Sequence, residues 1–301
     1  MRILISGGTG MIGKELIVQL HESGHELWIL TRSDKKDFYL PGVKMVQWDG
    51  CSLGTWSKTL NQVQAVINLA GENIGSKRWS LRRKEFILKS RVNAGNILTE
   101  AISKTSIRPE VFIQASAIGY YGTENDDVLT EMSSPGEDFL ANVCKRWEAS
   151  SLDLESIGIR RVLIRTGVVL SKKDGALNRM LIPIKLFIGG PIGNGRQMIS
   201  WIHPTDEVSA IKFLLENDKT TGVFNLTSPY PESNAVIGKY LAKLIHRPYW
   251  IPVPAFGLRI LLGEMSKLAL DGQIVVPQRL IEAGFSFKFE RIEDALKNIM
   301  A

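Results

Sequence analysis

The chain contains little cysteine and histidine, and each scarcity removes a class of site. Cys51 and Cys144 are its only cysteines among 301 residues, too few for a disulfide framework or a cysteine-rich metal centre. His21 and His25 stand in an H-E-x-x-H string (HESGH, residues 21–25), but the predicted helix ends at residue 23, and His203 and His246 show no comparable spacing. Because the zinc sites that use this string carry both histidines on one continuous helix, we expect no metal.

Long hydrophobic runs and long basic runs are also missing. No apolar run approaches the roughly 20 residues needed to cross a bilayer, so no membrane partner is expected. Strand-like residues directly after Met1 predict no targeting peptide and a cytoplasmic location. The densest basic run, KRWSLRRK at residues 77–84, is interrupted, so the net charge of +6 indicates anionic ligands rather than nucleic acid.

Apolar strands alternate with amphipathic helices through the first half of the chain. Residues 2–6 (RILIS) predict a strand, and residues 14–23 predict a helix with Leu16, Ile17 and Leu20 on one face. Further strands are expected at residues 27–30, 43–48, 65–69, 111–116, 161–166 and 223–227, and helices at residues 80–104, 139–156 and 204–216. This alternation predicts an α/β fold with a doubly wound, Rossmann-type parallel sheet.

The regular alternation of strands and helices ends after Thr166. Residues 198–202 read as a strand, the alternating segment FSFKFE at residues 285–290 predicts another, and residues 291–300 predict a last helix. We therefore expect a nucleotide-binding domain of residues 1–170 with 198–228. A smaller, discontinuous C-terminal lobe would comprise residues 171–197 with 229–301.

A glycine-rich segment joins the first strand to the first helix. Residues 7–13 read GGTGMIG, with glycines at a spacing that permits a tight turn and close approach of the backbone to a pyrophosphate. The helix N-terminus would present free N–H groups to the phosphates. The residues expected to bind the cofactor here are Gly7, Thr9, Gly10, Met11, Ile12 and Gly13.

The end of the second strand predicts which dinucleotide is bound. An NAD site places a carboxylate there to accept the ribose hydroxyls, but this chain has Thr31 and Arg32. Arg32 could fork onto a 2′-phosphate, with Ser33 and the lysines that follow as helpers. The alternative is that Arg32 only pairs with Asp34 on the surface. The pattern favours NADP(H).

Two later strand ends supply further candidates. Asp49 follows the third strand and could reach the adenine amino group, or could simply form a turn before Gly50. The fourth strand ends in NLAG, whose small residues suit a backbone that passes beneath a cofactor. The candidates from that string are Asn68, Leu69, Ala70 and Gly71.

Several strings together resemble the extended short-chain dehydrogenase/reductase superfamily. They are GGTGMIG at residues 7–13, NLAG at 68–71, SAIGYYG at 116–122 and RTGVVL at 165–170. More narrowly, NLAGENI at 68–74, KRW at 77–79, GGPIGNGRQMISWIH at 189–203 and VPQRLIEAGFSF at 276–287 resemble the SDR39U1-like branch of NAD(P)-dependent epimerase family proteins. The resemblance implies a seven-stranded nucleotide domain, a small C-terminal lobe and bound NADP(H), with Arg165 and Gly167 near the cofactor. It implies no substrate.

The chain departs from the catalytic pattern that the resemblance implies, Tyr-x-x-x-Lys beside a serine or threonine. Ser116, or the neighbouring Ala117 position, matches the hydroxyl residue, and Lys145 matches the lysine, but Ala141 occupies the tyrosine position. In the superfamily the lysine lowers the phenol pKa so that tyrosine exchanges a proton at neutral pH. Tyr121, or its neighbour Tyr120, could replace that acid, or both could pack against the cofactor or core.

Other polar residues belong to a predicted substrate cleft. The candidates are Arg78, Trp79, Arg91, Arg196 and His203, with Asp206 as a helix-terminal charge. Arginines suit a phosphate or carboxylate substrate, and the alternative for each is a surface or interdomain salt bridge.

Two functions remain open. The first is an NADP(H)-dependent oxidoreductase or epimerase of unusual acid–base design that uses Ser116, Tyr121 and Lys145 on an unknown small molecule. The second is an NADP(H)-binding sensor without turnover. The absent tyrosine favours the sensor, and the arginine-rich cleft favours the enzyme, which we prefer. A homodimer is left open.

Overall fold

A parallel sheet forms the centre of the molecule. The structure, a computed structural model, describes residues 1–32, 40–123 and 127–301. Within these residues the sheet has seven strands in the order β11-β7-β5-β4-β1-β2-β3, and every neighbouring pair is parallel. The strands are β1 (Arg2–Ser6), β2 (Glu26–Thr31), β3 (Val43–Gln47), β4 (Ala65–Asn68), β5 (Val111–Ala117), β7 (Arg160–Thr166) and β11 (Gly222–Leu226). All seven predicted strands of the sheet are confirmed.

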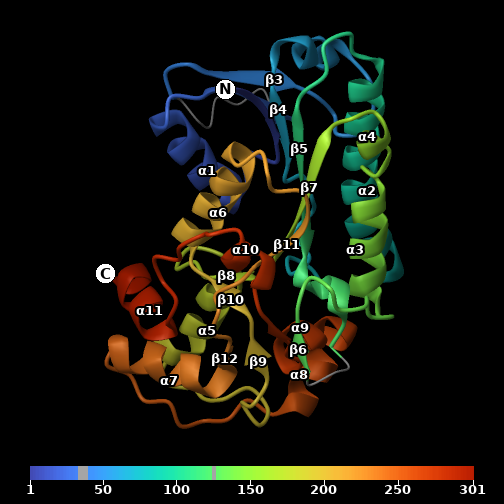
Figure 1. Ribbon diagram of the computed structural model, residues 1–301. Coiled ribbons are helices and arrows are strands. Elements are labelled where there is room, and N and C mark those ends of the chain that lie inside the picture. Colours follow the sequence, from blue (N-terminus) through green and yellow to red (C-terminus); the bar gives the residue numbers. More distant parts are fainter. Residues whose placement is uncertain (33–39, 124–126) are drawn as a thin grey trace.

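Helices cover both faces of this sheet. On one face lie α1 (Met11–Glu22) and α6 (Pro204–Glu216); on the other lie α2 (Leu81–Lys104), α3 (Phe139–Ala149) and α4 (Asp153–Ser156) (Figure 1). Two apolar cores fill the space between helices and sheet, one on each face. Strands buried on both sides read as continuous apolar runs, which explains why they were visible in the sequence. The predicted Rossmann-type α/β fold is confirmed. A membrane-crossing helix is absent from the described part of the chain.

The predicted helix over residues 139–156 is in fact two helices. Helix α3 ends at Ala149, and α4 begins at Asp153. Between them the Ser150 hydroxyl donates to the carbonyl of Trp147 (2.6 Å), and the Ser151 hydroxyl donates to that of Glu148 (3.4 Å). Serine hydroxyls that bond to the preceding turn compete with the helical backbone, which accounts for the interruption.

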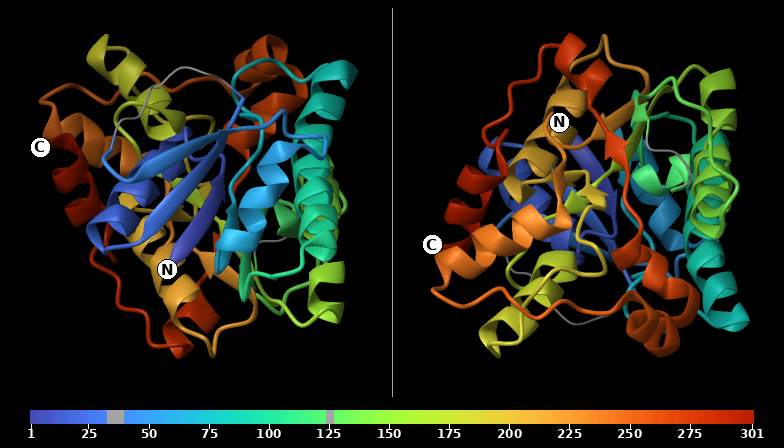
Figure 2. Two further views of the ribbon diagram at one scale, coloured as in Figure 1. Left: turned by 90° about the horizontal axis from the view of Figure 1, so that it is seen from above. Right: turned by 90° about the horizontal axis from the view of Figure 1, so that it is seen from below.

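A second group of elements lies at the carboxyl ends of the strands (Figures 1 and 2). Its helices are α5 (Gly175–Lys185), α7 (Asn234–Leu244), α8 (Ala255–Leu262), α9 (Lys267–Leu270), α10 (Gln278–Glu282) and α11 (Ile292–Met300). Three two-stranded ladders join it to the rest: β10 (Trp201–Ile202) with β8 (Val168–Val169), β12 (Glu232–Ser233) with β9 (Met198–Ile199), and β13 (Ile274–Val275) with β6 (Val128–Leu129). Short 3-10 helices are η1 (Thr55–Gln62), η2 (Ile118–Tyr121) and η3 (Gly263–Ser266).

This second group has its own apolar core, to which α5, α7 and α11 contribute. Leu280 of α10, however, belongs to the core that covers the sheet, so the C-terminal stretch also ties the two parts together. The division into residues 1–170 with 198–228 and residues 171–197 with 229–301 stays a prediction.

The predicted strand at residues 285–290 is wrong. This segment is irregular, although its alternation is real. Phe285 and Phe287 pack edge to face (4.9 Å between centroids) against the sheet's core. The N–H groups of Lys288 and Phe289 donate to the two carboxylate oxygens of Asp206 (2.8 and 2.9 Å). A carboxylate therefore takes the place of a neighbouring strand.

Candidate cofactor and substrate site

The glycine loop brings three backbone segments into contact. Gly7 has φ of +73°, and a Cβ there would lie 2.6 Å from the carbonyl of Leu69. A Cβ on Gly13 would lie 2.5 Å from the carbonyl oxygen of Gly7. Both glycines are required because the loop is packed against the end of β4 on one side and against helix α1 on the other.

Helix α1 begins without a side-chain cap. Its N-cap residue is Gly10, and the Lys14 N–H bonds to the Gly10 carbonyl (3.0 Å). The N–H groups of Met11, Ile12 and Gly13 lie before that bond, in the turn where a helix offers no internal acceptor. Thr9 and Gly10 are exposed. This turn combines free donors with the positive end of the helix dipole, an arrangement that binds phosphate.

The end of β4 is held from inside the sheet. Asn68 is fully buried and accepts hydrogen bonds from the Ser6 hydroxyl (2.5 Å) and the Ala70 N–H (3.2 Å), while its amide donates to Gln114 (3.0 Å). Its side chain thus fixes three strands rather than facing solvent. The Leu69 carbonyl faces Gly7, and Gly71 is exposed.

A hollow of about 470 Å³ lies beside the ends of β2 and β3. Its lining residues are Arg32, Gln47, Trp48, Asp49, Ser52, Gly54, Thr55 and Trp56. Arg32 is exposed and makes no hydrogen bond or ion pair within the described residues, whereas Thr31 is buried. Ser33, Asp34 and the lysines after them lie outside the described residues. An unpaired guanidinium at the rim of a hollow is available to an anionic ligand.

Asp49 forms a turn. Its carboxylate accepts hydrogen bonds from the Ser52 hydroxyl, the Cys51 N–H (2.9 Å) and the Ser52 N–H (2.8 Å), and these bonds lower the pKa of the carboxyl. The turn alternative considered for this residue is therefore what the structure contains. The side chain still borders the hollow, but its oxygens already have donors.

Ala141, at the position that corresponds to the catalytic tyrosine, is inaccessible to solvent. Ala141 lies in the first turn of α3 with no exposed surface, and its N–H donates to the capping residue Asp138 (2.8 Å). Lys145 is half-buried one turn later, and the one hydrogen bond of its ammonium within the described residues is a long one to the carbonyl of Gly136 (3.3 Å). This ammonium is available to a further acceptor.

Ser116, Tyr121 and Arg165 belong to one buried network. The Ser116 hydroxyl donates to Glu148 (2.6 Å), and Arg165 binds both oxygens of that carboxylate (2.8 and 2.9 Å). Arg165 also donates to the Tyr121 hydroxyl (3.1 Å), which in turn donates to Asn225 (2.7 Å). All five side chains are buried. The polar groups of the three predicted residues are thus bonded mainly to Glu148 and Asn225, and Arg165 is also bonded to Tyr121.

Tyr121, the candidate replacement acid, is a weaker acid than a tyrosine in water. Burial raises the pKa of Tyr121 to about 12 despite the nearby Arg165. The Arg165 guanidinium also stacks on the ring of Tyr120, 3.3 Å from its centroid. From the other side, Gln273 donates to the carbonyls of Ile118 (3.2 Å) and Gly122. The turn that carries both tyrosines is therefore held between Arg165 of β7 and Gln273.

The predicted substrate residues do not share one environment. Trp79 is buried, donates to the Ile74 carbonyl (2.8 Å) and stacks edge to face on Phe139 (5.2 Å). His203 caps α6 by accepting from the Thr205 N–H, and burial lowers its pKa to about 4. Arg78 and Arg196 are exposed. Gly167 donates its N–H to the Leu226 carbonyl (2.9 Å).

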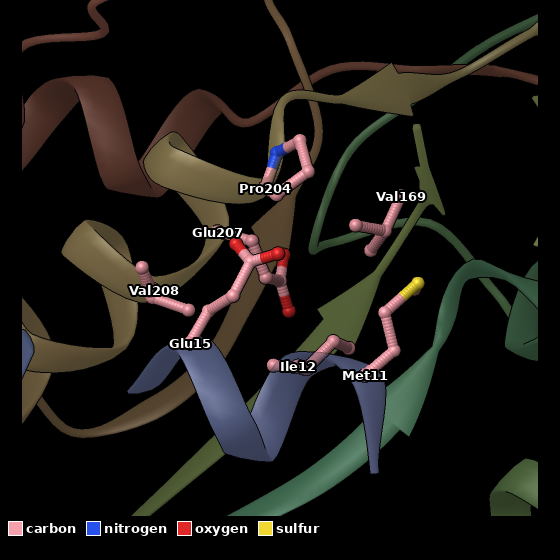
Figure 3. A pocket seen from close by; sticks show the side chains of 7 residues that line it. All are labelled: Met11, Ile12, Glu15, Val169, Pro204, Glu207 and Val208. Atoms are coloured by element: carbon pink, nitrogen blue, oxygen red, sulfur yellow. The ribbon is translucent and has the colours of Figure 1, made fainter. Parts of the chain in front are cut away.

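One buried acid beside the glycine loop escaped the sequence analysis. Glu207 of α6 is fully buried; one carboxylate oxygen accepts from the Thr166 hydroxyl (2.8 Å), and the other has no partner among the described residues. It lines a small pocket with Met11, Ile12 and Glu15 of α1 (Figure 3). Burial raises its pKa to about 8, so its carboxyl is mostly protonated at neutral pH.

Glu148 also escaped that analysis, but a signal was present. Arg165 interrupts the apolar strand RRVLIRT, and a guanidinium inside a buried strand requires a carboxylate. Glu148 lies one turn after Cys144 on the buried face of α3. Which carboxylate meets Arg165 depends on the packing of α3 on β5 and β7. The sequence therefore indicates that Arg165 needs a carboxylate, but the identity of that carboxylate depends on a tertiary contact.

Comparisons with known proteins agree with this architecture. The family model described as the NAD dependent epimerase/dehydratase family matches residues 3–227, and a domain of unknown function matches residues 253–299. The chain is 40% identical to the epimerase family protein YfhF of Bacillus subtilis, over 100% of this chain and 98% of that one. It is 40% identical to the chloroplastic epimerase family protein SDR39U1 homolog of Arabidopsis thaliana, over 100% of this chain and 87% of that one.

Solved structures show the same relationship. The crystal structure of human epimerase family protein SDR39U1 with NADPH matches with a TM-score of 0.86 and 31% identity, over 100% of this chain and 99% of that one. MoeE5 in complex with UDP-glucuronic acid and NAD matches with a TM-score of 0.81 at 19% identity, over 100% and 98% of the two chains, and shares the fold. The chain therefore belongs to the NAD dependent epimerase/dehydratase family, in its SDR39U1-like branch of epimerase family proteins.

Proposed function

We propose that this chain binds NADP(H) across the carboxyl ends of β4, β1 and β2 and acts as an atypical oxidoreductase or epimerase on a small molecule. The glycine loop and the uncapped first turn of α1 fit a pyrophosphate, and the hollow beside Arg32 fits the adenosine end. The human relative with 31% identity was crystallised with NADPH, whereas the more distant MoeE5 was crystallised with NAD.

Arg32 is the observation that carries the choice of NADP(H). It is exposed at the hollow with no partner among the described residues, and the one described carboxylate in that lining, Asp49, is occupied by its own turn. A guanidinium there can bind a 2′-phosphate through paired hydrogen bonds. A free carboxylate, which would accept ribose hydroxyls and repel that phosphate, is absent from the described lining.

Calorimetric titration with NADPH and NADH tests this choice. We expect NADPH to bind at least tenfold more tightly, since a hydrogen bond to a charged group is worth about 1.5–3 kcal/mol. Arg32→Ala should remove most of the difference. Arg108→Ala, which changes an exposed arginine beside the start of β5, should leave both affinities unchanged. Equal affinities in the parent protein would contradict the assignment.

The chain's own residues divide into two roles at the nicotinamide end. When bound, the cofactor supplies or accepts hydride. Lys145, with its incompletely satisfied ammonium, would bind a ribose hydroxyl. Ser116, Tyr121 and Arg165 would hold the end of β5 and the turn after it in place, since their polar groups already bond to Glu148 and to each other.

A sensor without turnover is the second candidate, and two observations favour it. Ala141 is closed off, and the raised pKa of Tyr121 makes it a poor proton donor at neutral pH. Oxidation of NADPH against a panel of carbonyl compounds separates the candidates. Turnover that survives in Tyr121→Phe but falls in Ser116→Ala supports the enzyme with a positioning serine. No oxidation by the parent protein across a broad panel supports the sensor.

A further inference from the structure

Arg91 of α2 has a basic side chain without an acidic partner. Among the described residues its guanidinium makes one hydrogen bond, from Nη1 to the Ile87 carbonyl (3.0 Å), and it lies over the ring of Trp147, 4.9 Å from the centroid. Across residues 1–32, 40–123 and 127–301 no carboxylate forms an ion pair with it. A largely buried cation that lacks an anion is costly for the folded protein.

The neighbouring acidic groups do not neutralise this charge. Glu72 is the carboxylate that acts electrostatically on Arg91, but it is paired with Arg83 (2.9 Å). Burial raises the pKa of the Cys144 thiol to about 12, so that group is neutral at physiological pH. Burial also lowers the pKa of Arg91 to about 10, which leaves the guanidinium charged. The region therefore has an excess of positive charge.

The guanidinium lies directly behind the end of β4. A Cβ on Gly71 would come within 3.1 Å of the guanidinium carbon and 3.3 Å of Nε of Arg91. Gly71 itself is exposed, and Arg91 keeps part of its surface open to solvent. The absence of a side chain at residue 71 thus lets the cation approach the surface at the carboxyl edge of the sheet, where ligands bind in such folds.

Arg91 also lies near the proposed nicotinamide end of the cofactor site. Trp147, on which it stacks, and Cys144, which it influences electrostatically, are both on α3. The Cys144 thiol contacts the carbonyl of Ala117 (3.6 Å), at the end of β5. Arg91 is therefore near the strand end and helix that carry Ser116 and Lys145, and distant in the strand order from Arg32 at the end of β2.

We propose that Arg91 binds the negatively charged group of the substrate, a carboxylate or a comparable oxyanion, against the open face of Gly71. This proposal rests on the proposed NADP(H)-dependent function. A planar guanidinium matches a carboxylate through two parallel hydrogen bonds, and a largely desolvated setting strengthens them. The bound anion supplies the partner that the protein itself does not provide.

Binding of oxalate to the NADPH-loaded protein tests the proposal, with oxamide as the uncharged probe of the same shape. We expect the parent protein to bind oxalate and not oxamide, measured by calorimetry. Arg91→Met should weaken oxalate binding at least tenfold, Arg91→Lys should retain part of it, and Arg146→Met, at an exposed arginine of α3, should leave it unchanged. NADPH affinity should change less than twofold in all three variants.

Thermal unfolding of the cofactor-free protein gives a second readout. If Arg91 is kept for a ligand, Arg91→Met should raise the unfolding temperature, because the variant no longer buries an unpaired charge. A lower unfolding temperature would assign Arg91 a structural role and overturn the proposal. Oxalate binding that is absent in the parent or unchanged in Arg91→Met would also overturn it. A tenfold loss of NADPH affinity in Arg91→Met would assign the anion to the cofactor's phosphates instead. Failure of the parent to bind NADPH would contradict the proposed function separately.

Discussion

Two arginines at the carboxyl ends of the sheet's strands, one after β2 and one near the end of β7, lie in different environments. Beside β2 and β3, Arg32 is exposed at the rim of a hollow and has no partner within the described residues. At the end of β7, Arg165 is only 3% exposed and binds both oxygens of Glu148 as well as the Tyr121 hydroxyl.

Exposure and the presence of a partner distinguish side chains that can bind a ligand from side chains that stabilise the fold. An exposed guanidinium loses little when it exchanges water for a phosphate. A buried pair is costly to break, since the remaining charge has no water to solvate it. The role of an arginine in a sequence motif therefore depends on whether the folded protein already supplies its partner.

Arg165→Met should produce the largest effect, because it leaves Glu148 buried without its cation. We expect a loss of about 3–5 kcal/mol in the free energy of unfolding, measured by urea denaturation. Arg32→Met, the matched change at the open end, should alter stability by less than about 0.5 kcal/mol. The double variant Glu148→Leu with Arg165→Met should recover part of the loss. Similar losses for the two single variants would remove the contrast between the ends.

The buried carboxyl of Glu207, beside the first turn of α1, predicts that the stability of the folded protein depends on pH. Its pKa is about 8 in the folded protein and near 4.5 when the chain is unfolded. The stability contributed by the protonated carboxyl is therefore complete below about pH 4.5 and is lost as the pH rises through about 8.

The matched variant for this effect is Glu207→Gln, which does not titrate and can still accept from Thr166. Between pH 5 and pH 8 the parent protein should lose stability relative to this variant by on the order of a few kcal/mol. Urea denaturation at several pH values measures the difference. Parallel stability curves for the two proteins would show that Glu207 ionises normally.

Among the changes to buried side chains, Tyr121→Phe should have the smallest effect on stability. The change removes a hydroxyl that links Arg165 to Asn225, and we expect a loss of about 0.5–1.5 kcal/mol in the free energy of unfolding. NADPH affinity should stay within twofold of the parent value. A strong loss of NADPH binding would place the Tyr121 hydroxyl at the ligand and would weaken the division between binding and positioning residues.

Local patterns predicted the strands of the parallel sheet well and the C-terminal part of the chain less well. The central strands β1, β4 and β5 are short, mainly apolar runs, and the glycine spacing marks the turn between β1 and α1. Residues 285–290 had equally clear alternation but form no strand, because Asp206 satisfies the backbone there. A pattern specifies which side of a segment is apolar, and the neighbouring chain decides whether a ladder forms.

From the amino-acid order alone follow the parallel sheet, the glycine cradle and the missing tyrosine at Ala141, because each depends on residues close together in the chain. The partners of the charged groups depend on packing. Glu148 meets Arg165 only because α3 packs on β5, the neighbour of β7, and Arg91 reaches Gly71 only because α2 packs behind β4. Burial and distance set the strength of a charge's interactions, and both arise only when segments distant in sequence come together.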